Sequence, residues 1–346
     1  MKLLDDLLLI QVSQERRVHQ FALYASHLAT GHSLFCMNLK AATIKQYLLA
    51  VAKFISRFAV IDPRFAQPSD KQMAKPIRAV LNEVERLEGI PNKVEPYTLS
   101  MQHHLEGMLT HAEDADGALA CCIDWFNNGL LVGYRLSEYG QKEGHSRLDC
   151  CAVDEQKVPI AFCLEDLTFL DEIGRRLSLE DFLHRLNLVV RIQLRFTHQK
   201  NRNNGEIKLF VRNSANPSRC FVLTMARIIR RFFRLVGHRT GIPLAVYKRG
   251  SEVVYLTEGV IAKTMKSLAC TVYNLDPRTD AVRFSSHSLR VGACVILHAN
   301  GFTASQIKFL LRWKSDAFME YLRNVAVLSN QQNRAVDLMD HMPNLI

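Results

Sequence analysis

The chain is organised around residues 284–323, which read FSSHSLRVGACVILHANGFTASQIKFLLRWKSDAFMEYLR. Breaks in the apolar pattern predict three short helices in this stretch. His287 and Arg290 are three residues apart and therefore share a helix face, and Trp313 and Tyr321 follow on the later helices. A histidine, an arginine, an indole donor and a phenol brought together by short helices predict chemistry on a phosphate, with the tyrosine as nucleophile.

A second arginine motif lies upstream, at the end of a largely apolar helix predicted from residue 119. The helix runs into Gly133, and Arg135 and Glu138 follow with a spacing of three. Read alone, such a pair is most simply an exposed ion pair worth a few tenths of a kcal/mol. It becomes interesting only because a phosphate-directed set of residues lies downstream.

The clearest hairpin in the chain lies between these two motifs. Apolar and polar residues alternate over 190–196 and again over 207–212, and Asn204-Gly205 provides the turn signal. Lys200 lies just before the turn and Lys208 lies in the second strand. Without further context, both lysines are explained as charges that protect an exposed hairpin edge.

Taken together, these motifs resemble the active site of the tyrosine recombinases, also called the phage integrase family. The matching elements are an upstream Arg with an acid three residues on, His-x-x-Arg, a His-or-Trp position and the nucleophilic Tyr. The sequence pattern "HSLRVGA … LLRWKSDAFMEYLR", with Trp rather than His before the tyrosine, most resembles recombinases of Crypton-like and DIRS-like mobile elements. The resemblance covers residues 96–325 and, more weakly, residues 15–95.

The resemblance implies a role for each matched residue in cutting and rejoining DNA through a 3′-phosphotyrosine, without a metal, ATP or another cofactor. The nucleophile would be Tyr321, and the phosphate would be held by guanidinium and indole donors, with a histidine as acid/base and a hairpin lysine as general acid. Glu138 would hold Arg or His in place. The implied catalytic residues are Arg135, Lys200 (with Lys208 as the alternative), His287, Arg290, Trp313 and Tyr321.

Net charge favours an acidic partner. The chain carries 44 Lys and Arg against 34 Asp and Glu, a net charge of +10, and residues 185–239 hold 13 Lys and Arg but one acid. Such a field is typical of nucleic-acid binding, although a basic stretch can also be a solvated face. The candidate contacts to double-stranded DNA are Arg191, Arg195, Arg202, Arg227, Arg230, Arg231 and Arg234.

The expected fold class is mainly α with a small antiparallel β-sheet (α+β). Helical periodicity predicts a bundle over 1–95, and the Pro- and Gly-containing segment 89–96 reads as a linker. The resemblance implies that 1–95 is a core-binding domain that clamps DNA. It also implies that 96–346 is the catalytic domain, with a tail from about 329. A strand is predicted within 159–171, and further helices at 178–186, 218–237 and 255–272.

Nine cysteines without a Cys-x-x-Cys motif indicate reduced thiols inside a cell, and no stretch predicts a signal peptide or a membrane span. The expected location is therefore intracellular with the DNA, and nuclear if the host is eukaryotic. The resemblance implies self-association into a synaptic tetramer on DNA. Two alternatives stay open: a type IB topoisomerase, and a relative that binds DNA without catalysis.

Overall fold

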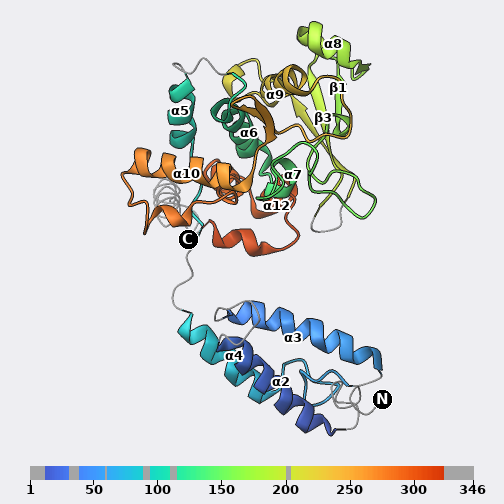
Figure 1. The fold of residues 1–346 in the computed structure, drawn as a ribbon, viewed down its shortest axis with the longest axis vertical. Coiled ribbons are helices and arrows are strands. Elements are labelled where there is room, and N and C mark those ends of the chain that lie inside the picture. The colour runs from blue at the N-terminus through green and yellow to red at the C-terminus, as the bar shows by residue number, and fades with distance from the viewer. Residues whose placement is uncertain are drawn as a thin grey trace, which may run out of the picture. The chain divides into compact units, whose positions relative to one another are not determined.

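The computed structural model describes residues 12–30, 39–58, 61–88, 94–109, 115–199 and 204–322. The chain divides into two compact units, Met1–Asn92 and Lys93–Ile346 (Figure 1). The first unit is helical in its described part, and the second combines helices with small antiparallel sheets. The predicted fold class, mainly α with a small antiparallel sheet, is confirmed.

The described part of the first unit contains three α-helices that follow the apolar periodicity of the sequence. They are α2 (Gln14–Ala29), α3 (Ala41–Ile55) and α4 (Lys75–Leu87). The Ser13 hydroxyl accepts a hydrogen bond from the Arg16 N–H and so begins α2. Residues spaced three or four apart form one core, in which Ala25, Ile44 and Ile77 are fully buried.

In the second unit, helix α6 (Ala118–Val132) is the central element. Nearly all of it is buried, and it packs against α9 (Phe221–Val236) and α11 (Ser288–Ala299). It ends at Gly133, whose φ of 63° lies in the left-handed region that glycine tolerates best. The other α-helices in the described part of the unit are α5 (Leu99–Met108), α7 (Leu136–Tyr139), α8 (Leu179–His184), α10 (Glu258–Tyr273) and α12 (Ala304–Leu311).

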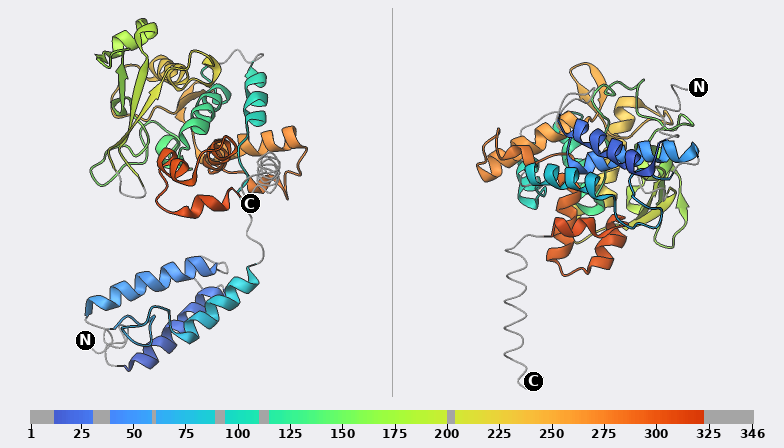
Figure 2. Two further views of the ribbon diagram at one scale, coloured as in Figure 1. Left: turned by 180° about the vertical axis from the view of Figure 1, so that it is seen from behind. Right: turned by 90° about the horizontal axis from the view of Figure 1, so that it is seen from below.

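A four-stranded antiparallel sheet stands at one side of this unit (Figures 1 and 2). Its order is β2-β1-β3-β4, formed by Arg176–Leu177, Leu167–Leu170, Arg191–Phe196 and Glu206–Val211. The predicted hairpin is thus present as β3 and β4, and Leu194 pairs with Lys208. Gly205 has a φ of 86°, as the Asn-Gly turn signal predicts.

Two sequence predictions about strands need correction. The strand expected within 159–171 begins only at Leu167, because Leu164–Asp166 forms a 3-10 turn in which the Asp166 carboxylate accepts from the Cys163 N–H. A second hairpin, β5 (Val246–Arg249) with β6 (Glu252–Tyr255), was not predicted. The helix expected from residue 255 therefore starts later, as α10, with Thr257 at its N-cap.

The organising stretch folds into α11, α12 and the 3-10 helix η7 (Asp316–Glu320). A capping box between Thr303 and Gln306 opens α12. These elements enclose a small core of their own, made of Ala293, Cys294, Ile307, Leu311, Phe318 and Leu322, with Trp313 and Tyr321 at its border. The side chains expected to carry chemistry therefore lie on elements fixed by packing.

None of the helices in the described ranges is both long and apolar enough to cross a membrane. The predicted tail from about 329 lies outside the described residues.

Candidate active site

The junction between α6 and α7 positions Arg135 and Glu138. Arg135 is the N-cap of α7, and its backbone N–H donates to the Glu138 carboxylate at 2.9 Å. Its guanidinium also donates to that carboxylate, at 3.1 Å. Glu138 is only 2% exposed, so this is a buried ion pair and not the exposed pair that the spacing alone favours.

Arg290, on the first turn of α11, is 1% exposed. Its guanidinium donates to the Gly133 carbonyl, at the end of α6, and to the Leu311 carbonyl, at the end of α12. Helix C-termini carry partial negative charge and are therefore favourable acceptors for a cation. The guanidinium carbon also lies 4.3 Å from the centre of the Trp313 ring.

The charge of Arg290 is incompletely balanced by its surroundings. Burial, followed by the nearby Arg135 guanidinium, lowers its pKa to about 9, against the opposing effect of Glu138. The side chain still carries its proton at neutral pH, but in a place where a further negative charge would be stabilising. A buried arginine with a depressed pKa is thus a candidate for binding an anion.

Arg312 is a third arginine of the site and, like Arg290, is buried; it was not predicted from the sequence. It is the C-cap of α12, with a left-handed φ of 58°, and is 5% exposed. Its guanidinium donates to the Glu138 carboxylate at 2.8 Å and to the Val132 carbonyl at 3.3 Å. It also lies 3.7 Å from the centre of the Phe196 ring on β3. Arg312 therefore connects α6, α7, α12 and the hairpin.

Burial also lowers the pKa of Arg312, partly offset by Glu138. Its carboxylate partner is 174 positions away in the sequence, so no local spacing could reveal the pair. The available signal was positional: Arg312 directly follows a capped helix, where glycine is the usual residue.

His287 and Tyr321 form the most direct chemical contact in the site. The histidine Nε2 is 3.0 Å from the tyrosine hydroxyl, and either atom can donate according to the histidine tautomer. Tyr321 follows η7 and is half-buried; burial and the nearby Glu320 raise its pKa, against the opposing effect of Arg290. The phenol is therefore protonated at neutral pH and has a histidine placed to exchange that proton.

Trp313 lies between the arginine and the tyrosine. Its ring stacks on Arg290 and is 5.9 Å, centre to centre, from the Tyr321 ring. The indole Nε1 is buried and has no hydrogen-bond acceptor among the described residues. Since indole can only donate, this N–H is free to bind an oxygen that enters the site.

The structure thus brings together six of the predicted residues, Arg135, Glu138, His287, Arg290, Trp313 and Tyr321. Of the two candidate lysines, Lys200 lies outside the described residues, as does Arg202. Lys208 donates to the Phe309 carbonyl at 3.0 Å and is 3.1 Å from the Glu206 carboxylate. Its ammonium therefore joins the hairpin to α12 through the Phe309 carbonyl and also pairs with Glu206 on its own strand.

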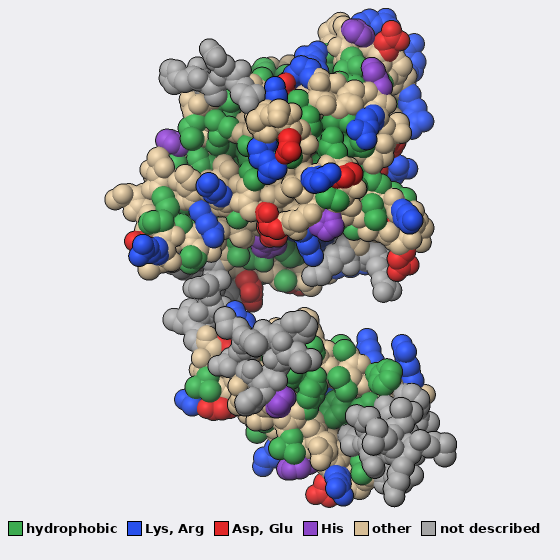
Figure 3. Space-filling view, viewed as in Figure 1, with side chains coloured by type: hydrophobic (Ala, Val, Ile, Leu, Met, Phe, Trp, Pro, Cys, Tyr) green, Lys and Arg blue, Asp and Glu red, His purple; other side chains and the backbone are tan. Residues whose placement is uncertain are grey.

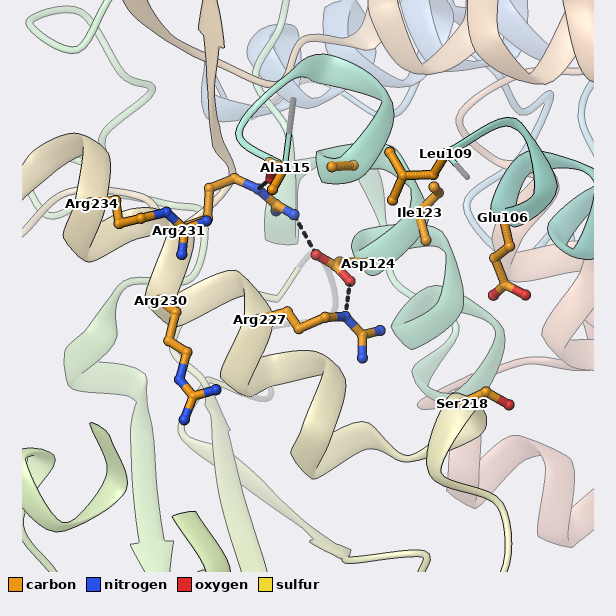
Figure 4. Close-up of a pocket in the computed structure, with 11 residues that line it drawn as sticks. Glu106, Leu109, Ala115, Ile123, Asp124, Ser218, Arg227, Arg230, Arg231 and Arg234 are labelled. Carbon is orange, nitrogen blue, oxygen red and sulfur yellow. Dashed lines mark hydrogen bonds and ion pairs between the residues drawn. The ribbon is translucent and has the colours of Figure 1, made fainter. Parts of the chain in front are cut away.

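The arginines of α9 have a different environment. Figure 4 shows the Asp124 carboxylate between Arg227 and Arg231, at a cavity of about 490 Å³. Asp124 is 2.6 Å from Arg227 and also binds Arg231, while Arg234 binds Asp116. On the face drawn in Figure 3, basic side chains of this unit form separate groups with acidic ones among them.

Arg231 requires a correction. The sequence predicts it at a DNA-facing surface, but it is 3% exposed and packs between α9 and α6. Burial opposes its charge, but Cys121 and Asp124 outweigh burial and raise its pKa. The buried face of α9 is therefore wider than its apolar residues indicate, because it includes this paired arginine.

The β3 arginines lie on the sheet, half-buried or exposed. Arg191 donates to the Glu172 carbonyl at 2.9 Å, and Arg195 donates to the Glu165 carbonyl at 3.2 Å. Backbone acceptors such as these orient a guanidinium without cancelling its charge. Arg195 is in addition 3.5 Å from the Asp166 carboxylate, so Arg191 keeps more of its positive charge available at the surface than Arg195 does.

No metal site is apparent in the described ranges: they contain no group of three or more His, Cys, Asp and Glu side chains that could hold an ion.

Comparison with known proteins gives structural neighbours only. No protein-family model and no curated protein matches the sequence. A Tn1549 transposon integrase variant in complex with transposon right-end DNA is similar over 92% of this chain and 84% of its own, with 13% identity and a TM-score of 0.46. The same integrase with a circular-intermediate DNA covers 90% and 81%, with 15% identity and a TM-score of 0.41. The XerA recombinase covers 92% and 98%, with 13% identity and a TM-score of 0.38. At these TM-scores the likeness adds no argument, and the site rests on its own contacts.

Proposed function

We propose that the protein is a site-specific DNA recombinase that cleaves and rejoins strands through a 3′-phosphotyrosine. The observation that carries this proposal is the 3.0 Å contact between Tyr321 and His287 beside the buried, incompletely balanced Arg290. A nucleophile, a proton acceptor and a phosphate-binding cation are the three parts that such chemistry needs.

The scissile phosphate would bind to Arg290, Arg135 and Trp313. A guanidinium has five N–H donors, and the two carbonyl bonds of Arg290 leave others for phosphate oxygens. The unpaired Trp313 Nε1 supplies one more donor. Together these groups would neutralise the charge that grows on the non-bridging oxygens in the pentacoordinate transition state.

Proton transfer would follow from the His287–Tyr321 contact. The raised pKa of Tyr321 keeps the phenol neutral until it attacks, so His287 would accept its proton as the oxygen–phosphorus bond forms. The bond to the 5′ oxygen breaks at the same time, and Lys200 would protonate that leaving oxygen. Lys200 is preferred for this role because the Lys208 ammonium is already bound by the Phe309 carbonyl and the Glu206 carboxylate.

The phosphodiester bond that breaks would be replaced by a phosphotyrosine ester, so rejoining would need no ATP. Arg290 and Arg135 would supply the positive charge that a metal ion would otherwise provide. A 5′ hydroxyl from another strand would attack the phosphotyrosine and give its proton to the now neutral Lys200, while His287 returns a proton to the departing Tyr321 oxygen. Carried out on two duplexes by a synaptic tetramer, this exchange would integrate or excise a mobile element. The protein would then act where the DNA is, in the nucleus of a eukaryotic host.

Glu138 and Arg312 would position the catalytic groups without touching the substrate. Glu138 binds both Arg135 and Arg312 through its two carboxylate oxygens. Arg312 also contacts Phe196, on the strand that leads to Lys200. A change at Arg312 would therefore displace both Arg135, through Glu138, and the β3–β4 hairpin, through Phe196.

DNA contacts outside the site would come from Arg191, Arg195 and Arg202 on the hairpin and from Arg227, Arg230 and Arg234 on α9. The helical unit 1–95 would clamp the duplex. Within this unit, Lys45 is 2.6 Å from Glu85, so its charge is partly neutralised.

A nicked suicide duplex tests the proposal. Loss of a short 3′ fragment traps the covalent intermediate, so the wild-type chain should give an SDS-resistant adduct, and Tyr321→Phe should bind the duplex without forming it. Tyr273→Phe is the matched control, because its ring is 42% exposed in the same unit. An adduct of undiminished yield in Tyr321→Phe would contradict the nucleophile assignment.

The same preparation separates the two alternatives. Exchange of strands between two labelled duplexes is expected for a recombinase, whereas relaxation of supercoils without exchange would indicate a topoisomerase. DNA binding with no adduct from the wild-type chain would indicate a relative without catalysis.

A further inference from the structure

Strand β4 carries an exposed apolar row on its solvent side. Ile207, Leu209 and Val211 are 55%, 52% and 55% exposed, whereas the residues between them turn inward. The inward Phe210 ring stacks on Phe221 of α9, with ring centres 3.9 Å apart. The inward Lys208 points to Phe309 and Glu206. The outer row therefore contains no charged side chain.

The backbone of the same three residues is open to pairing. Arg212 N–H donates to Val190 O, which makes 190 and 212 a hydrogen-bonded pair of the β3–β4 ladder. Because such pairs alternate, the N–H and C=O of Ile207, Leu209 and Val211 point away from β3. Among the described strands, β3 is the one neighbour of β4. The free edge thus has both unpaired backbone groups and an apolar row.

We propose that this edge pairs with the β4 edge of a second copy of the chain, in an antiparallel ladder centred on Leu209. A two-fold axis perpendicular to the sheet keeps each side chain on its own face. Residues 207, 209 and 211 must then pair among themselves, because a one-residue shift would oppose outward and inward side chains. Centring on Leu209 sets Ile207 opposite Val211 of the second copy.

This register is self-complementary in three respects. It joins the two apolar rows into one continuous strip, and it gives every outward N–H and C=O of the three residues a partner. It also places Glu206 opposite Arg212 of the second copy, so charges of opposite sign face each other. A shift by two residues, centred on 207 or 211, leaves only one apolar pair of the three; the shift centred on 211 also loses the charge match, whereas the one centred on 207 sets Glu206 opposite Lys208.

The outward row of this edge carries none of the usual protection. Natural edges avoid pairing through charged side chains, prolines or bulges. The lysine of β4 faces inward, where its ammonium is already bound by the Phe309 carbonyl and the Glu206 carboxylate, and the strand has no proline. The second copy is therefore the occupant that the edge fits by its own sequence, and the dimer forms without DNA.

The test is sedimentation velocity of the full chain without DNA, over a hundredfold range of concentration. The wild type should show a reversible monomer–dimer equilibrium, and Leu209→Lys, which places two like charges at the axis, should weaken it at least tenfold. Leu209→Pro should do the same, because it removes an outward N–H and leaves the β3–β4 bonds in place. Ile173→Lys is the matched control: Ile173 is 73% exposed elsewhere and should leave the dimer unchanged.

A cysteine scan fixes the register and does not depend on the stability of those variants. Hydrogen-bonded antiparallel pairs have Cα atoms about 5.5 Å apart, within disulfide range. Under mild oxidation, Leu209→Cys should form a disulfide dimer well above the wild-type background. Val211→Cys alone should not, but it should cross-link when mixed with Ile207→Cys.

A wild-type chain that is monomeric at every concentration would overturn the proposal. So would a dimer that Leu209→Lys leaves intact, or a cross-link that is no stronger at 209 than at 211. None of these outcomes affects the strand-cleavage proposal, because neither experiment contains DNA.

Discussion

Arg290 and Arg231 are buried to nearly the same extent, at 1% and 3% exposure, yet their surroundings act on them in opposite directions. Arg231 shares the Asp124 carboxylate with Arg227, and the surrounding charges raise its pKa despite its burial. Arg290 is bound by two backbone carbonyls and lies near a second arginine, and its pKa falls to about 9. The charge of Arg231 is balanced by a carboxylate, whereas the charge of Arg290 is not.

The difference shows why a count of arginines cannot locate a phosphate site. The α9 helix carries more arginines than α11, but three of the four on α9 are bound to aspartates. At the candidate active site, Arg135 and Arg312 share the Glu138 carboxylate, and Arg290 forms no ion pair with the described acidic residues. An incoming phosphate would meet a buried, incompletely balanced positive charge there.

The largest expected difference is between Gln substitutions at the two buried arginines, one of which should affect cleavage and the other stability. Arg290→Gln should slow adduct formation on the suicide duplex by about 10³-fold, because a preorganised donor to the transition state is lost. Arg231→Gln should leave that rate within about threefold but lower the free energy of unfolding by about 3 kcal/mol, since a buried ion pair is broken. Rapid-quench cleavage and urea denaturation measure the two quantities. Equal losses of cleavage in both variants would remove the distinction.

The next largest effect on cleavage is expected from Arg312→Gly. Glycine accepts the left-handed backbone, so the turn should persist, but Glu138 loses a donor and Arg135 its fixed position. We expect cleavage at saturating DNA to fall by about 10²-fold, the scale of a small misplacement of catalytic groups. Binding of the intact duplex, measured by fluorescence anisotropy, should be unchanged. An unaltered cleavage rate would limit Arg312 to a role in folding.

The depressed pKa of Arg290 predicts a pH dependence of binding. Only protonated Arg290 attracts the phosphate, so above about pH 9 the free protein must take up a proton to bind. In the Tyr321→Phe background, the affinity for a cognate duplex should therefore be flat below pH 9 and fall above it, by at most tenfold per unit.

A duplex with a neutral methylphosphonate at the scissile position is the control for that titration, because it cannot gain from the arginine charge. Its affinity should vary less above pH 9. Arg290→Gln should likewise flatten the curve, and a fall that persists in this variant would assign the titration to another group.

The smallest effect is expected on α9. Arg230 is exposed, whereas Arg234 is bound to Asp116. If this helix touches the DNA backbone, Arg230→Ala should weaken binding a few-fold at moderate salt and reduce the slope of log K against log salt by about one. Arg234→Ala should do less. The reverse order would mean that the aspartate releases Arg234 on binding.

Local patterns in the sequence were sufficient to predict most of the fold. Helical periodicity located α2, α3 and α4, and alternation with Asn-Gly located the hairpin, because these signals depend on neighbours within a few residues. The β5–β6 hairpin was not predicted. Strand β1 is shorter than expected because the Asp166 carboxylate caps the turn before it.

The site was predictable only where a motif carried it. Arg135, His287, Arg290, Trp313 and Tyr321 do converge, as their order in the sequence predicted. Arg312 and the paired state of Arg231 were not predictable, because their acidic partners are 174 and 107 positions away. Charge pairing over such distances depends on the tertiary fold, which a linear reading does not contain.

The stacking of Trp313 on Arg290 has a practical consequence. The chain contains two tryptophans, and the other, Trp125, is enclosed among Tyr134 and Tyr139. In a Trp125→Phe chain, the remaining indole would be an intrinsic fluorophore set between the guanidinium and the phenol. Its emission would report substrate arrival optically, in real time and without an attached dye.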